Sequence, residues 1–197
     1  MKLGIIGGGA WGTALAQVAS ANDRETLLWA LEPEVVESVN STHENTVYLA
    51  GVQLNSAIYA TSNLAELDCC DAWLVVTPAQ HMRAVLERAS DCSKPIVLCA
   101  KGIEEKSGQF LHQVARQTCP RAQVAVLSGP TFAHEVAKGL PTAVTLAAED
   151  GLLAEELRDR ITPVPVTVSW DSAREVEALL DQLFTHRAAR GEPATAR

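Results

Sequence analysis

A glycine-rich segment near the N-terminus has the residue types and spacing of a phosphate-binding turn. Gly7, Gly9 and Gly12 fall on the pattern G-x-G-x-x-G, between the apolar run 2–6 and a helix-like stretch that begins at Thr13. The first glycine permits a tight turn, the second lets the backbone approach a pyrophosphate, and the third lets the helix pack on the strand. Free N–H groups and the dipole at the helix start favour an anion. The pattern predicts dinucleotide binding, with a ligand-free turn as the alternative.

A carboxylate stands 20 positions after the last of these glycines. Glu32 follows the second apolar run, 26–31, where an acid accepts hydrogen bonds from an adenosine ribose. Its negative charge repels a 2′-phosphate, which favours NAD over NADP. The alternative is a solvated charge in front of Pro33.

Three further apolar runs end in residues that can contact a substrate. They are the run 72–77, followed by Pro78, the run 95–100, followed by Lys101, and the run 124–127, followed by Ser128-Gly129-Pro130-Thr131. Because the carboxyl ends of parallel strands lie at one edge of a sheet, we expect these residues to join the glycine turn in one site. Lys101 is expected to clamp an anionic or carbonyl group, with a surface lysine as the alternative. His134 is expected to be a surface side chain.

The elements that must position these residues alternate along the chain. Apolar runs predict strands at 2–6, 26–31, 57–61, 72–77, 95–100, 124–127, 142–146 and 165–169. Helical patterns occur at 13–19, 33–40, 63–67, 79–89, 108–118 and 149–161. Continuous apolar strands separated by helices are typical of a mostly parallel sheet covered on both faces. The sequence predicts an α/β, Rossmann-type doubly wound dinucleotide-binding domain over residues 1–170. Residues 171–197 are expected to form an atypical tail with a charged helix at 171–190.

The composition excludes several classes of protein. Of the 197 residues 47% are hydrophobic and 20% are charged, and the net charge of −8 is not interrupted by a basic cluster. This acidity argues against nucleic acids and anionic membrane surfaces as partners. No segment approaches the ~18 apolar residues of a membrane span and no signal peptide is seen, so we expect a cytoplasmic protein. Five scattered cysteines predict neither a disulfide framework nor a metal site.

Four segments together resemble the NAD(P)-dependent glycerol-3-phosphate dehydrogenase family. They are residues 5–16 (IIGGGAWGTALA), 76–83 (VTPAQHMR), 100–104 (AKGIE) and 128–143 (SGPTFAHEVAKGLPTA), and they come in the family's order. The resemblance covers residues 1 to about 146. It implies hydride transfer between NAD or NADP and dihydroxyacetone phosphate, which gives sn-glycerol 3-phosphate for phospholipid synthesis. A homodimer is possible, but the resemblance does not decide the oligomeric state.

The resemblance also implies roles for individual residues. The cofactor-binding positions that it implies are Gly7, Gly9, Ala10, Trp11, Gly12, Pro78, Lys101 and Ala133. The substrate-binding positions are Lys101, Gly129 and Thr131, and Lys101 is the residue expected to orient the substrate for catalysis. No metal is implied.

The sequence departs from the family pattern at two places. The family usually has a basic residue where this chain has Leu31, which weakens the case for NADP and makes Glu32 more decisive. The resemblance fades near Asp171, where the family continues into an all-helical domain that supplies a lysine proton donor. Because this sequence has no lysine after Lys138, we expect the chemical step to be slowed by ~10²–10⁴-fold. The alternatives are a non-catalytic dinucleotide-binding module and an inert fragment.

Overall fold

A computed structural model describes residues 1–89, 93–129, 131–142, 144–148, 150–161 and 166–169. The helix expected at 171–190 and the domain boundary expected after residue 170 lie outside these ranges. Within them, no helix combines the length and the apolar character needed to cross a bilayer.

Strands and helices alternate along the described chain. The strands are β1 (Leu3–Ile6), β2 (Thr26–Trp29), β3 (Ile58–Thr61), β4 (Ala72–Val75), β5 (Ile96–Leu98), β6 (Val124–Ser128), β7 (Val144–Ala148) and β8 (Val166–Ser169). The helices are α1 (Ala10–Ala19), α2 (Pro33–Thr42), α3 (Ala79–Leu86), α4 (Leu111–Thr118), α5 (Ala133–Ala137) and α6 (Gly151–Ile161), with a 3₁₀ helix η1 (Leu64–Cys69).

The described strands form one sheet in the order β3-β2-β1-β4-β5-β6-β7-β8. The pairs from β3 through β6 are parallel, β7 runs antiparallel to β6, and β8 is parallel to β7. After β1 the chain goes to β2 and β3 on one side and later returns to β4 on the other. This reversal of strand order between β1 and β4 is a topological switch point, where open α/β sheets bind their ligands.

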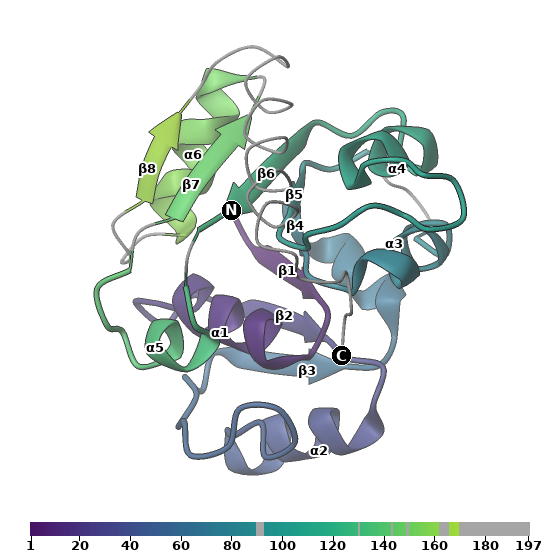
Figure 1. The fold of residues 1–197 in the computed structure, drawn as a ribbon. Coiled ribbons are helices and arrows are strands. Elements are labelled where there is room, and N and C mark those ends of the chain that lie inside the picture. Colours follow the sequence, from purple (N-terminus) through teal and green to yellow (C-terminus); the bar gives the residue numbers. More distant parts are fainter. Residues whose placement is uncertain (90–92, 130, 143, 149, 162–165, 170–197) are drawn as a thin grey trace, which may run out of the picture.

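Helices cover both faces of the sheet, and each face has its own hydrophobic core (Figure 1). One core holds Ile5 and Leu74 and packs against α1, α5 and α6. The other holds Ile6 and Trp73 and packs against η1, α3 and α4. Successive strand residues therefore enter opposite cores, which explains why the sequence shows unbroken apolar runs instead of alternation.

The predicted α/β, Rossmann-type sheet is confirmed, and several elements differ locally from their expected bounds or type. The first helix begins at Ala10, three residues before the stretch expected at 13–19, and the short helix expected at 63–67 is a 3₁₀ helix. The helix expected from Gly108 begins at Leu111. Gly108 has a φ of +69°, so the chain still turns at this residue and enters the helix only afterwards.

The cysteines depart from the sequence-based expectation. Cys119 is buried and disulfide-bonded, whereas Cys69, Cys70 and Cys99 are free thiols. A single bridge is not visible in the cysteine spacing, because the fold alone decides which sulfur atoms meet.

Candidate functional site

The glycine turn has the shape that its spacing predicts, and each glycine is needed for a different reason. Gly7 leaves β1 with a φ of +129°, and a Cβ built there would lie 3.0 Å from the backbone carbon of Val76. A Cβ on Gly12 would lie 1.8 Å from the carbonyl oxygen of Gly7. Gly9 differs, because no heavy atom lies within 4 Å of its built Cβ. The open space beside Gly9 is where a pyrophosphate could approach the backbone.

The start of α1 is arranged to receive an anion. Gly9 is the N-cap residue, no side chain caps the helix, and the first turn carries no acidic residue. The helix dipole and the first backbone N–H groups therefore lie beside the open space at Gly9, and no side chain of the described residues caps them. Ala10 and Trp11 form this first turn and are half-buried.

A buried amide holds the glycine turn from behind. Asn45 is fully buried, and its Nδ2 donates to the carbonyl oxygen of Gly8 at 2.8 Å and to Oγ1 of Thr13 at 2.7 Å. Its Oδ1 accepts from the backbone N–H of Tyr48 at 3.0 Å. These bonds join the turn to the first turn of α1 and to the segment that follows α2, so the anion site is held in place before a ligand arrives.

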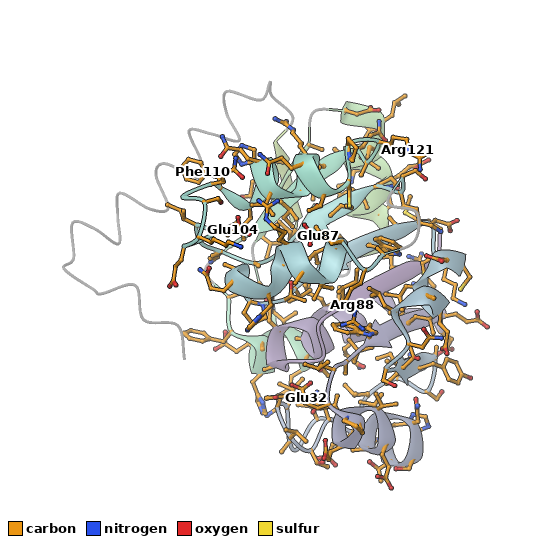
Figure 2. All side chains as sticks on the ribbon, turned by 90° about the vertical axis from the view of Figure 1, so that its right-hand side faces the viewer. Glu32, Glu87, Arg88, Glu104, Phe110 and Arg121 are labelled. Atoms are coloured by element: carbon orange, nitrogen blue, oxygen red, sulfur yellow. The ribbon has the colours of Figure 1, made fainter. Side chains whose placement is uncertain are left out.

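Glu32, the predicted ribose-binding acid, lies at the end of the molecule that carries α2, and Glu104 lies away from it (Figure 2). Glu32 is the N-cap residue of α2, but its side chain does not cap that helix. Its Oε1 instead accepts a hydrogen bond of 3.1 Å from the Tyr48 hydroxyl. Glu32 follows β2 at the carboxyl edge, as its spacing predicts, and is half-buried.

A cavity of about 190 Å³ opens at the carboxyl ends of β5 and β6. Its lining residues are Trp11, Cys99, Lys101, Leu127, Ser128, Gly129 and Thr131. The structure therefore brings together Trp11, expected to bind a cofactor, and the three residues expected to bind a substrate, of which Lys101 is expected to contact the cofactor as well. Lys101 reaches across the cavity, with its Nζ 3.4 Å from the carbonyl oxygen of Gly129.

Two buried hydroxyls at this edge have no hydrogen-bond partner among the described residues. Ser128 lines the cavity and is 8% exposed, and Thr77 follows β4 and is 4% exposed. Buried hydroxyls are usually paired, and unpaired ones cost free energy. A polar ligand in this cavity is one way to satisfy Ser128, which sequence reasoning placed only within a turn.

Pro78 and Ala133, two further predicted cofactor contacts, are not among the residues that line the cavity. Pro78 is the N-cap residue of α3 and is exposed. Ala133 begins α5, which packs along α1 (Figure 1). His134 is exposed, as expected for a surface histidine.

The residues that sequence reasoning missed lie in one long connection. Asn45 and Tyr48 belong to the segment between α2 and β3, which has no helical or strand periodicity. The only signal was its length, because long connections inside compact domains are often functional.

Comparisons of the sequence and of the structure with known proteins both find glycerol-3-phosphate dehydrogenases. Residues 2–154 match the family model described as NAD-dependent glycerol-3-phosphate dehydrogenase N-terminus. The glycerol-3-phosphate dehydrogenase (NAD(P)+) of Parvibaculum lavamentivorans is 54% identical over 163 residues, which is 81% of this chain and 49% of that protein. That of Rhodospirillum rubrum is 54% identical over 159 residues, which is 79% of this chain and 46% of that protein. The chain spans about half the length of these curated relatives.

Solved structures show the same half-length match. Glycerol-3-phosphate dehydrogenase from Coxiella burnetii aligns with a TM-score of 0.79 at 30% identity, over 86% of this chain and 53% of that one. The enzyme from Plasmodium falciparum aligns with a TM-score of 0.77 at 23% identity, over 87% of this chain and 52% of that one, a likeness of fold.

Proposed function

This chain belongs to the NAD-dependent glycerol-3-phosphate dehydrogenase family through its N-terminal domain, and we propose that it binds a nicotinamide dinucleotide at the glycine turn. The observation that carries the proposal is the open space beside Gly9, next to a helix start that no side chain caps. A pyrophosphate is the anionic part of NAD and NADP, and it fits this arrangement of backbone N–H groups. Glu32 would accept hydrogen bonds from the adenosine ribose, which favours NAD.

We further propose that the cavity beside Lys101 receives dihydroxyacetone phosphate or sn-glycerol 3-phosphate. The relatives are named glycerol-3-phosphate dehydrogenase (NAD(P)+). When bound, the nicotinamide supplies the hydride chemistry. The Lys101 ammonium places a positive charge over the cavity, where it would orient an anionic or carbonyl oxygen. The cavity walls provided by Gly129 and Thr131 would hold the small substrate against Trp11 and the glycine turn.

Turnover by these 197 residues alone is expected to be poor. The sequence has no lysine after Lys138, whereas family members are expected to use a lysine proton donor beyond the dinucleotide-binding domain. Loss of a positioned general acid costs ~10²–10⁴-fold in the chemical step. The net charge of −8 argues against a nucleic-acid partner.

The first experiment is a titration of the purified chain with NADH, followed by nicotinamide fluorescence. Saturable binding is expected, and Lys101→Met should weaken it because the ammonium is lost. Lys106→Met removes an exposed lysine from the same loop and serves as the matched control. Absence of saturable binding by the unsubstituted chain would refute the proposed dinucleotide site.

A second candidate function is a non-catalytic dinucleotide-binding module. It is favoured by the geometry of the glycine turn, which by itself accounts for nucleotide binding and not for catalysis. Steady-state oxidation of NADH with dihydroxyacetone phosphate separates the two. Tight NADH binding without any substrate-dependent oxidation supports the module, and measurable oxidation that Lys101→Met abolishes supports the enzyme.

A further inference from the structure

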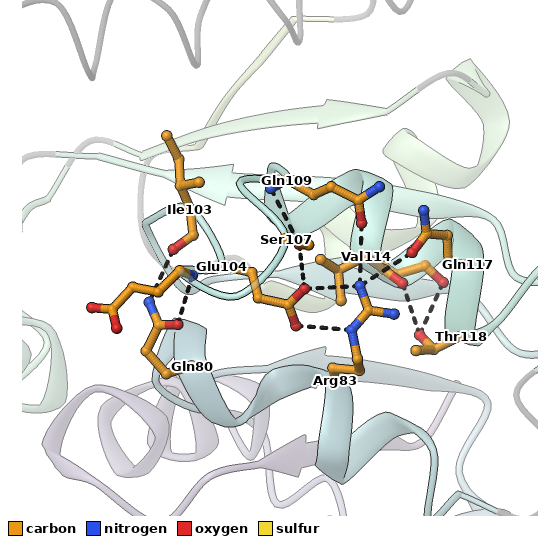
Figure 3. A network of polar contacts seen from close by, with 11 residues as sticks. Gln80, Arg83, Ile103, Glu104, Ser107, Gln109, Val114, Gln117 and Thr118 are labelled. Atoms are coloured by element: carbon orange, nitrogen blue, oxygen red, sulfur yellow. Dashed lines mark hydrogen bonds and ion pairs between the residues drawn. The ribbon is translucent and has the colours of Figure 1, made fainter.

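A buried carboxylate lies three residues after Lys101. Glu104 is 6% exposed, and a charge so placed needs both an opposite charge and hydrogen bonds. Arg83 meets it as a two-pronged fork, with Nε 2.8 Å from Oε1 and Nη2 2.9 Å from Oε2 (Figure 3). The Ser107 hydroxyl also donates to Oε2. The hydrogen bonds from Arg83 and then Ser107 lower the pKa of Glu104 to about 2, so this carboxyl stays ionised near neutral pH.

The guanidinium that holds Glu104 is itself fixed from two more sides. Its Nη2 donates to Oε1 of Gln109 at 3.2 Å and to Oε1 of Gln117 at 3.1 Å. Gln109 belongs to the loop between β5 and α4, and Gln117 belongs to α4. Arg83 therefore ties α3, this loop and α4 together, and its planar fork makes the arrangement specific in direction.

A second side chain of α3 binds the backbone on both sides of Glu104. Gln80 lies three residues before Arg83 and so faces the same way along the helix. Its Nε2 donates to the carbonyl oxygen of Ile103 at 2.9 Å, and its Oε1 accepts from the N–H of Glu105 at 2.9 Å (Figure 3). The loop is thus held to α3 by one ion pair and by two hydrogen bonds from the Gln80 side chain to the loop backbone, all within three consecutive loop residues.

These contacts reach Lys101 through the backbone. On the strand side, the N–H of Cys99 donates to the carbonyl oxygen of Val75 at 2.9 Å. On the loop side, Gly102 has a φ of +141°, and a Cβ built there would lie 3.0 Å from Cβ of Ala79. Lys101 sits between these two fixed points. Its Nζ also lies 3.4 Å from the carbonyl oxygen of Gly129, near the outer limit of a hydrogen bond.

We propose that Arg83 and Gln80 of α3, acting through Glu104 and its neighbours, are positioning residues that set Lys101 at the mouth of the cavity. The proposal rests on the proposed function for what Lys101 contacts, but the positioning itself concerns only this chain. Because Pro78 is the N-cap residue of α3, the same helix also joins the loop after β4 to the loop after β5. The contact between Arg83 and Glu104 would therefore pass a displacement of one loop to the other.

The test is a double-mutant cycle on NADH affinity. Glu104→Gln keeps the side-chain shape and removes the charge that Arg83 holds. It is expected to raise the dissociation constant about tenfold, the order of loss seen when a contact that orients a binding residue is removed. In a Lys101→Met background the same change should have no effect, because the residue that it positions is gone. Glu105→Gln, an exposed carboxylate in the same loop, is the matched control and should leave affinity unchanged.

The opposite results are as informative. Equal weakening in both backgrounds would mean that Glu104→Gln loosens the fold in general, and no weakening in either would mean that the network does not act on Lys101. Either result overturns the proposal. Arg83→Lys keeps the positive charge but loses the two-pronged contact, whereas Arg83→Met loses both. If the ion pair positions Lys101, NADH affinity should be higher in Arg83→Lys than in Arg83→Met.

A second readout does not depend on the cofactor. If the unsubstituted chain fails to bind NADH, the proposed function fails, and acetylation of Lys101 by acetic anhydride decides the positioning. Glu104→Gln is expected to change the rate of acetylation of Lys101 about threefold relative to that of Lys138, which is also exposed, because the surroundings of the Lys101 ammonium change when the loop is no longer held. An unchanged ratio of the two rates would overturn the proposal even where NADH binds.

Discussion

The hydroxyl of Tyr48 donates a hydrogen bond of 3.1 Å to Oε1 of Glu32, across 16 residues of sequence. The bond, with the nearby carboxylate charge, raises the pKa of Tyr48, so the phenol keeps its proton and remains a donor. The segment that carries Tyr48 also carries Asn45, which holds the glycine turn. One connection between α2 and β3 therefore contacts both the expected pyrophosphate end and the expected ribose end of the dinucleotide site.

The first prediction concerns the choice between NAD and NADP. Glu32→Gln removes the negative charge that would repel a 2′-phosphate, so the ratio of NADPH to NADH affinity should rise about tenfold, or about 1.4 kcal/mol. Tyr48→Phe keeps the carboxylate but removes its donor, and should weaken NADH binding with little gain for NADPH. Fluorescence titrations with both cofactors measure the ratio. An unchanged ratio in Glu32→Gln would show that this carboxylate does not face the ribose.

The second prediction compares two glycines of the same turn. Gly12→Ala places a methyl group 1.8 Å from the carbonyl oxygen of Gly7, and should destabilise the fold by about 3 kcal/mol. Gly9→Ala places it in open space at a φ of −69°, and should change stability by no more than about 1 kcal/mol. The same Gly9 variant should bind NADH at least tenfold more weakly, because its methyl group occupies the space of the pyrophosphate.

Urea unfolding and NADH titration of the two variants separate these effects. A Gly9→Ala variant that keeps both stability and affinity would contradict the assignment of the open space to a ligand.

The third prediction concerns the buried amide behind the turn. Asn45→Ala removes the amide that donates to the carbonyl oxygen of Gly8 and to the hydroxyl of Thr13, and leaves Gly8 with the longer 3.4 Å bond from Thr13. It should cost about 2–4 kcal/mol of unfolding free energy. Asn63→Ala removes an exposed cap of η1 and should cost only about 1 kcal/mol. Urea unfolding of both variants checks the contrast, and equal losses would mean that the glycine turn does not depend on Asn45.

The fourth prediction is the acid dependence of stability. The pKa of Glu104 is about 2 in the folded chain against an ordinary value of 4.5. Because the folded value is the lower one, its contribution to stability is complete above about pH 4.5 and is lost as the pH falls toward 2. Urea unfolding midpoints measured at steps across this window should fall less steeply for Glu104→Gln than for the unsubstituted chain. Parallel curves would mean that Glu104 is not tied to Arg83 in solution.

The sheet could be predicted because each strand leaves a local signal. Runs such as 72–77 and 95–100 are apolar without a break, since both faces of the sheet are buried against separate cores. The turn at Gly7 and the lysine after β5 could be predicted because a parallel sheet places all its carboxyl ends at one edge. The start of α4 was misplaced, because Gly108 has a φ of +69° and the helical pattern of the sequence does not reveal this turn.

The supporting residues of the site could not be predicted for a related reason. Asn45 and Tyr48 act on partners 37 and 16 residues away, and a polar side chain in an irregular segment gives no periodic signal. Glu104 could be seen in a lysine–glycine motif, but its partner Arg83 lies 21 residues earlier, on another helix. Roles that depend on which segments the fold brings together need the structure.

β7 runs antiparallel to β6, so the strand direction in the sheet reverses between them. β7 and β8 run against the other strands, so the loop after β7 emerges at the edge where β6 begins. There Asp150 accepts from the N–H of Leu152 at the start of α6 and from the side chain of Gln123 before β6. Because the cavity opens at the opposite edge, at the carboxyl ends of β5 and β6, we expect surface mutations at this edge to leave ligand binding unchanged. It is therefore the side of the molecule on which a label or an immobilisation tag can be placed.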